Sequence, residues 1–118
     1  MPFKSPDALL PLTPVAFEIL LALAEDDLHG YAILQAVEAR LSGMLPLRTG
    51  TLYRSLARLL DDGLIEEVAG SASSDERRRY YGITSHGREV AALEAGRLAG
   101  QVAAARARRL MPARKARP

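Results

Sequence analysis

Residues 50–65 carry the pattern that most restricts how this chain can fold. Leucines recur there at the spacing of one face of an α-helix, at Leu52, Leu56, Leu59 and Leu60. At about 100° per residue, Thr51, Arg54 and Arg58 point away from that face. We expect Thr49 to cap the helix, give or take one residue, and Gly63 to stop it before a strand. The same pattern also fits a surface helix with solvated arginines, so the rest of the chain must decide between the two.

Length and composition exclude several classes of protein. A chain of 118 residues has room for one modest core, and without cysteine it forms neither disulfides nor thiolate metal sites. His29 and His86 are far apart in sequence, and we expect ordinary surface or capping residues rather than metal ligands. The sequence shows no nucleophile paired with a base and no phosphate-binding loop. We therefore predict a non-enzymatic protein without a cofactor or a metal ion.

The sequence also predicts a cytoplasmic protein without a membrane segment. Glu18 and the acidic residues 25–27 interrupt the richest apolar stretch, so no run of 18 apolar residues occurs. The N-terminus lacks a charged and then apolar leader.

The distribution of charge is more informative than the net charge of +2. Residues 106–118 hold six basic residues and no acidic one, which leaves ten basic and fourteen acidic residues in the body of the chain. The body is therefore mildly acidic, and net charge alone does not argue for nucleic acid. Basic residues nevertheless cluster on the helix described above and in the run Arg77, Arg78 and Arg79. If both clusters lie on one face, they form a positive patch that attracts a DNA duplex.

Two further helices are expected before the leucine-rich one. Residues 1–12 contain three prolines and read as a flexible N-terminal arm with a short hydrophobic anchor near its end. Thr13 followed by Pro14 starts the first helix. Residues 15–24 of this helix are almost entirely apolar, so it should be covered on both sides, and a second subunit would supply the second cover. Residues 28–43 are expected to form a second helix with one apolar face.

The segment after the leucine-rich helix reads as a hairpin. Residues 64–69 form one strand, residues 70–76 a polar tip and residues 77–83 a returning strand. Tyr80 and Tyr81 point to opposite faces of the returning strand, so one of them should be core. Three helices followed by two strands and a long tip have the order of a winged helix-turn-helix.

The last helix, from residue 84 to about residue 108, carries a seam of small apolar residues. Their spacing of 4, 3, 4 and 3 is that of a heptad repeat: Ala91, Ala95, Leu98, Val102 and Ala105. Gly96 and Gly100 allow close helix approach on a neighbouring face. A helix that protrudes from a small domain lacks an internal partner, so we favour a homodimer over a helix folded back on its own domain. The predicted dimer interface comprises Phe17, Leu20, Ala91, Ala95, Leu98 and Val102.

These elements predict a mostly helical α+β fold, a winged helix-turn-helix with a long C-terminal dimerisation helix. The DNA-binding domain would span residues 13–84 and the dimerisation helix residues 85–110. Residues 111–118 would form a disordered basic tail, which either binds phosphates non-specifically or has no role.

Three separated motifs resemble the PadR family of transcriptional regulators. The first is Leu28-His29-Gly30-Tyr31-Ala32-Ile33. The second runs from Gly50-Thr51-Leu52-Tyr53 through Leu56 and Leu59 to Asp62-Gly63-Leu64-Ile65. The third is Arg79-Tyr80-Tyr81-Gly82-Ile83-Thr84 with Gly87-Arg88. The motifs span about residues 12–98, and the single C-terminal helix is similar to that of the short PadR subfamily.

The resemblance implies a homodimeric repressor that binds an inverted-repeat operator in double-stranded DNA until an effector acts. It implies that Thr51 and Tyr53 lie at the DNA and that the wing arginines reach the backbone or the minor groove. Tyr53 also fits a core position with its hydroxyl at the surface. The predicted DNA-binding residues are Thr49, Thr51, Tyr53, Arg54, Arg58, Arg77, Arg78 and Arg79.

The role of Arg54 is inferred from its chemistry, because the family often has another residue at this position. Arginine suits either a bidentate contact with guanine or a clamp on phosphate. A phosphate contact is favoured, because most protein–DNA hydrogen bonds go to the backbone.

The signal to which such a regulator responds is not evident from the sequence. Some members of the family bind flat aromatic compounds between the dimerisation helices, often with the help of tryptophan, which this chain lacks. A small hydrophobic effector would have to use Phe17, Tyr31 or Phe3, which fit plain core positions at least as well. The alternative function is a winged-helix protein–protein interaction module regulated by a partner protein that binds the acidic patches. The placement of the arginines argues against this alternative.

Overall fold

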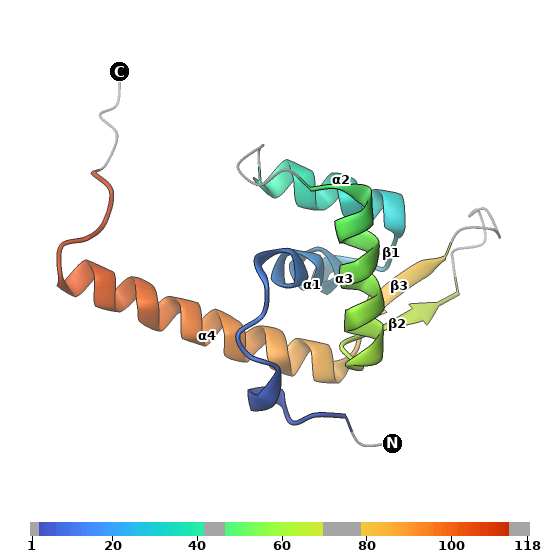
Figure 1. Ribbon diagram of the computed structural model, residues 1–118, viewed down its shortest axis with the longest axis horizontal. Helices are drawn as coiled ribbons and strands as arrows, with labels where there is room; N and C mark the ends of the chain where they lie inside the picture. Colours follow the sequence, from blue (N-terminus) through green and yellow to red (C-terminus); the bar gives the residue numbers. More distant parts are fainter. Residues whose placement is uncertain (1–2, 42–46, 70–78, 114–118) are drawn as a thin grey trace.

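Three packed helices, a small antiparallel sheet and a long C-terminal helix make up the described chain (Figure 1). The computed structural model describes residues 3–41, 47–69 and 79–113. The first three helices and the sheet enclose one hydrophobic core, and the C-terminal helix runs from this core past the N-terminal segment. The predicted mostly helical α+β winged helix-turn-helix is confirmed. Within the described residues, no helix combines the length and apolarity needed to span a membrane.

The first helix, α1 (Pro14–Glu25), begins as the sequence predicts. Thr13 Oγ1 accepts a hydrogen bond from the Ala16 N–H at 3.1 Å, and Pro14 occupies the first turn, where its missing N–H costs nothing. Its buried residues are Ile19, Leu20 and Leu23. The helix contacts α2, α3, α4 and β3, so other elements of the same chain cover much of its apolar surface.

The N-terminal segment has a defined place against the rest of the protein. Residues Pro6–Leu9 form a short 3-10 helix, η1, which contacts the C-terminal helix. Leu9, Leu10 and Leu12 pack against the core. The hydrophobic anchor near the end of this segment is therefore present. Residues 9–12 pack against the core instead of extending freely from it.

The second helix, α2 (Gly30–Leu41), starts later than predicted, because residues 28 and 29 form a strand instead. This strand, β1 (Leu28–His29), pairs with Tyr81 and Tyr80 of the returning strand. The side chain of His29 caps α2, since its Nδ1 accepts a hydrogen bond from the Ala32 N–H at 3.1 Å. The expectation of a capping histidine is confirmed, and the expectation that this segment opens the helix was wrong. Residues 42–46, at the predicted end of the helix, lie outside the described residues.

The third helix, α3 (Thr49–Asp61), has the predicted leucine face. Its buried residues are Leu52, Leu56 and Leu59. Thr49 is the first helical residue rather than the cap; Arg48 occupies the cap position and makes no side-chain capping bond. The predicted stop at Gly63 is confirmed by its left-handed φ of 73°. The Leu64 N–H donates to the Leu59 carbonyl at 2.9 Å, and the Gly63 N–H to the Leu60 carbonyl at 3.1 Å, which closes the helix end.

The sheet has three antiparallel strands in the order β1-β3-β2 among the described residues. Strand β2 (Ile65–Val68) pairs with β3 (Tyr80–Ile83) in a register that sets Ile65 opposite Ile83. Tyr81 is buried, whereas Tyr80 is half-buried and packs edge-on against the His29 ring at a centroid distance of 5.4 Å. The prediction that one of the two tyrosines is core is confirmed. The predicted tip, residues 70–76, lies outside the described residues.

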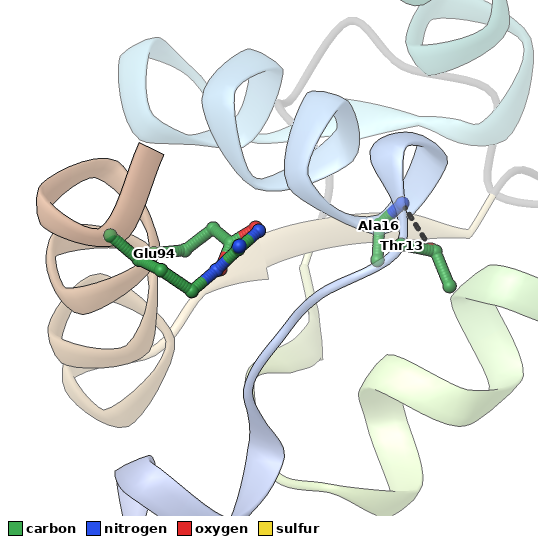
Figure 2. Close-up of polar contacts among 4 residues, drawn as sticks. Thr13, Ala16 and Glu94 are labelled. Carbon is green, nitrogen blue, oxygen red and sulfur yellow. Dashed lines mark hydrogen bonds and ion pairs between the residues drawn. The ribbon is translucent and has the colours of Figure 1, made fainter. Parts of the chain in front are cut away.

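The C-terminal helix, α4 (Ser85–Ala107), is fixed to the core at its N-terminal half. Thr84 caps it by accepting a hydrogen bond from the Gly87 N–H at 2.9 Å. Further along, Glu94 is only 2% exposed and accepts two hydrogen bonds of 2.8 Å from Arg97. The Arg97 hydrogen bonds hold the pKa of Glu94 below its ordinary value, and the nearby backbone N–H of Leu12 acts in the same direction. Figure 2 shows the Glu94 side chain between α4 and the segment that leads into α1.

Candidate nucleic-acid interface

The α3 helix has one buried face and one exposed polar face. Three leucines hold its inner face in the core at exposures of 2% or less. On the outer face, Tyr53 is 49% exposed, Thr51 is half-buried, and Arg54 and Arg58 are exposed. Thr49 is exposed in the first turn. The five predicted DNA-binding residues of this segment thus lie on α3, whose leucine face packs against the core.

The two arginines of this face are free of carboxylate partners within the described chain. Arg54 bends back along the helix, donating from Nη2 to Thr51 Oγ1 at 3.3 Å. Its guanidinium passes so near Gly50 that a Cβ there would stand 3.4 Å from Arg54 Nη1. Among residues 3–41, 47–69 and 79–113, neither Arg54 nor Arg58 forms an ion pair, whereas Arg40, Arg79 and Arg97 do. Two uncompensated guanidinium groups on one exposed face favour an anionic partner.

Tyr53 is positioned by a residue whose importance the sequence reasoning missed. A Cβ atom built on Gly30 would stand 2.7 Å from Tyr53 Oη and 3.3 Å from ring carbons Cε1 and Cζ. The phenol therefore lies over the glycine at the start of α2. The alternative interpretation, in which the Tyr53 ring packs in the core, was wrong, because Tyr53 is 49% exposed and is not among the core residues. A glycine in the first turn of the predicted helix over residues 28–43 was the available signal.

The wing contributes one described arginine. Arg79 Nη1 lies 3.9 Å from Glu67 Oε2, and the Arg79 side chain is 73% exposed, so solvent weakens the pair. Burial raises the pKa of the nearby Tyr81 phenol, and the negative charge of Glu67 raises it further, while Arg79 opposes both. Tyr81 is therefore a neutral core residue at physiological pH. Arg77 and Arg78 lie outside the described residues.

The predicted dimer residues divide between the protein's own core and its surface. Leu20 is 0% exposed in the single chain, so its assignment to the dimer interface was wrong: a side chain already enclosed by the core cannot contact a partner. Ala91 is half-buried against the same core. Further along α4, Leu98 is half-buried and Ala95 and Val102 are exposed, and Phe17 of α1 is half-buried. The part of the seam beyond Ala91 is therefore accessible for contact with a second subunit.

Two of the predicted effector residues, Phe17 and Tyr31, occupy different helices. Tyr31, in the first turn of α2, is 61% exposed, and Phe17 lies on α1. The described residues form a cavity between the N-terminal segment and α3 and a groove between α1 and α2. Neither Phe17 nor Tyr31 lines these two hollows. The described residues contain no cluster of three or more histidine, cysteine, aspartate or glutamate side chains that could hold a metal ion.

A helix that is buried on one side, open on the other and followed by an antiparallel wing defines a winged helix-turn-helix protein. The chain belongs to the transcriptional regulator PadR-like family, whose model matches residues 19–93. The resemblance inferred from the three motifs is thereby confirmed. The family consists of transcriptional regulators and not of enzymes, as the sequence predicted.

Two uncharacterized proteins are similar in sequence to part of this chain. The chain is 36% identical over 70 residues to an uncharacterized protein X of Lysinibacillus sphaericus, covering 59% of this chain and 64% of that protein. It is 40% identical over 87 residues to an uncharacterized 37.1 kDa protein in transposon TN4556 of Streptomyces fradiae, covering 71% of this chain. The chain thus spans less than two thirds of each relative, and only 24% of the second.

Solved structures share the fold at low sequence identity. A PadR family regulator from Clostridium difficile R20291 is similar with a TM-score of 0.68 and 23% identity, covering 80% of this chain and 96% of that one. A Streptococcus mutans UA159 protein covers 97% of this chain and 98% of its own, with a TM-score of 0.68 and 17% identity, which matches the short form with one C-terminal helix. Bacillus subtilis PadR, crystallised with operator DNA, has a TM-score of 0.56 and 23% identity over 67% of this chain and 45% of that one.

Proposed function

We propose that the protein is a homodimeric repressor that binds an inverted-repeat operator through α3 and the wing. The observation that carries this proposal is the two-sided character of α3, whose leucines are buried while Arg54 and Arg58 are exposed and unpaired in the described chain. A helix held by one face presents the other rigidly, as contact with base edges and phosphates requires. The shared fold with a Bacillus subtilis regulator crystallised on operator DNA supports the same surface. Because DNA is the proposed partner, the proposed place of action is the cytoplasm.

The exposed part of α4 supports a homodimer. Val102 is 43% exposed and Ala95 is exposed, although both are apolar and follow the heptad spacing. Pairing two such helices about a two-fold axis would bury this surface. It would also present two copies of α3 to half-sites one helical turn of DNA apart, ~34 Å.

An effector would relieve repression by changing the spacing of the two α3 helices. A Cβ on Gly96 or Gly100 would meet nothing within 4 Å in the single chain, so no bulky side chain at these positions locks the crossing of two α4 helices. A ligand that binds one crossing angle better than another shifts the population toward it. A hydrophobic effector that uses Phe17 and Tyr31 is the proposed signal.

Selection of binding sites from random DNA by the purified protein tests this function. We expect enrichment of an inverted repeat, with an affinity that falls as salt rises by a slope of about −0.9 per neutralised phosphate. Failure to enrich any sequence, together with salt-independent binding to DNA, would reject the proposal. The protein–protein interaction module would then be the better description.

A further inference from the structure

A cavity of about 360 Å³ lies between the N-terminal segment and α3. Its volume is at the lower end of the range for small-molecule sites, roughly 300–1,000 Å³. One side is aliphatic, and its residues come from the N-terminal segment, α1 and the inner edge of α3: Leu9, Pro11, Leu12, Ala16 and Leu59. The other side is polar and includes Arg54, Ser55 and Arg58.

The aliphatic wall is held in place by a helix cap and by packing against the core. The Thr13 side chain caps α1 through the Ala16 N–H at 3.1 Å, and Leu9 and Leu12 pack against the hydrophobic core. Figure 2 shows the hydrogen bond between Thr13 and Ala16 at the start of α1. The wall is therefore built into the fold.

Charge and shape select the chemistry of a ligand. Two guanidinium groups, Arg54 and Arg58, line the polar side against one carboxylate, Asp62, so the cavity carries a net positive charge. Neither arginine has an ion-pair partner in the part of the chain that the structure describes. None of the described lining residues is aromatic, so the walls offer aliphatic contact rather than ring stacking.

We propose that this cavity binds a medium-chain aliphatic carboxylate and that the bound ligand competes with DNA. The carboxylate pairs with Arg54 and Arg58, and the chain lies against Leu9, Leu12 and Leu59. The competition rests on the proposed function, because the same two arginines belong to the proposed DNA surface. By linkage, a ligand that occupies them weakens operator binding by the same factor by which the operator weakens ligand binding.

Calorimetric titration of octanoate into the DNA-free protein tests the site itself. We expect saturable binding of one octanoate per chain. Octanol is a neutral analogue of equal chain length and lacks the charge that the arginines recognise. Its affinity should therefore be lower than that of octanoate by about tenfold or more. Equal binding of octanol and octanoate, or no binding of octanoate, would overturn the proposal.

Matched substitutions on α1 locate the site. Ala16→Leu fills the cavity, whereas Ala22→Leu places the same side chain in the separate groove between α1 and α2. We expect Ala16→Leu to weaken octanoate binding by about tenfold or more and Ala22→Leu to leave it unchanged. Ser55→Leu fills the cavity from the opposite wall and serves if circular dichroism shows that Ala16→Leu is unfolded. Equal octanoate binding by the filled and control variants would place the ligand elsewhere and reject the site.

Competition on the selected operator separates this inference from the proposed function. Octanoate should raise the apparent Kd of the wild-type protein for its operator and should not affect Ala16→Leu, which keeps both arginines. If octanoate binds at the cavity but leaves operator affinity unchanged, the shared use of the arginines is wrong and the inference fails, while the regulator function stands. If octanoate binding maps to the cavity and no operator exists, the proposed function fails, while the anion site stands.

Discussion

The Tyr53 phenol lies over the backbone of Gly30, so that a Cβ at position 30 would stand 2.7 Å from Tyr53 Oη. This contact joins the exposed face of α3 to the first turn of α2, and it joins two of the motifs that mark the family. The ring remains 49% exposed despite the contact. Gly30 thus sets where the tyrosine of the proposed DNA surface rests.

Gly30→Ala should weaken operator binding without unfolding the protein. The added methyl displaces the end of a flexible side chain, not backbone, and alanine favours a helix over glycine by up to about 1 kcal/mol. We expect operator affinity, measured by fluorescence anisotropy, to fall by about tenfold. In a Tyr53→Ala background the same change should have no further effect. An equal loss in both backgrounds would show that the glycine does not act through Tyr53.

Arg54→Ala distinguishes base recognition from phosphate binding. If Arg54 reads a base, the change should cost ~1–3 kcal/mol on the operator and relax specificity at one position. If it clamps phosphate, all sequences should lose affinity alike and the salt slope should flatten by about one unit. Arg88→Ala, which removes an exposed arginine of α4 that donates to the Ala24 carbonyl, is the control and should bind normally. Unchanged binding of Arg54→Ala to every sequence would remove Arg54 from the site.

The buried Glu94 should make folding sensitive to acid. The hydrogen bonds from Arg97 hold the pKa of Glu94 below its ordinary value; the charge of Arg97 and the Leu12 N–H act in the same direction, and burial opposes them. The unfolded chain therefore takes up this proton at a higher pH than the folded chain does. The stabilisation is complete above the unfolded pKa of about 4.3 and is lost as pH falls through the folded pKa.

Glu94→Gln should lower the free energy of unfolding at pH 7 by about 1–3 kcal/mol, because a neutral amide loses the charge-assisted bonds to Arg97. Urea denaturation between pH 3 and pH 7 should show the gap to wild type closing at the acid end. Glu89→Gln changes an exposed carboxylate of the same helix and should show no such gap. A gap that stays constant down to pH 3 would mean that Glu94 does not titrate as described.

Gly87→Ala should destabilise the fold. A Cβ on Gly87 would overlap the Leu64 carbonyl oxygen and stand 2.9 Å from Ile83 Cγ1. Since the obstacle is backbone, relief requires α4 to move away from the strand, at a cost of roughly 1–3 kcal/mol or more. Ser85→Ala changes an exposed residue in the same turn and should shift stability by less than about 0.5 kcal/mol. Equal midpoints of urea denaturation for the two variants would contradict the close packing.

Leu98→Glu should separate the proposed dimer into monomers. The heptad spacing places Leu98 on the seam with Ala95 and Val102, and a buried carboxylate without a partner is costly at an apolar interface. Leu93 is 39% exposed and lies on the opposite side of α4 from Ala95, so Leu93→Glu is the matched control and should remain dimeric. Light scattering gives the mass of each. A dimeric Leu98→Glu, or a monomeric Leu93→Glu, would overturn the choice of face.

Much of the fold could be predicted because its elements are encoded locally. Thr13 and Pro14 mark the start of α1. The spacing of its leucines and the glycine at position 63 mark the extent of α3. Helical periodicity and capping depend on neighbours three or four residues apart. The exposed arginines of α3 could be predicted for the same reason, since the face opposite a buried stripe follows from the helix geometry.

Other features depended on partners distant in sequence, and only the tertiary structure decided them. Leu28 and His29 join a strand because Tyr81 and Tyr80 lie beside them, and Leu20 is core because the chain's own elements cover α1. Glu94 is buried because the N-terminal segment passes over α4 and brings Leu12 to it. An apolar face on a helix indicates that another surface covers it, but it does not identify that surface. Burial depends on both packing surfaces, and the periodicity of one segment describes only its own.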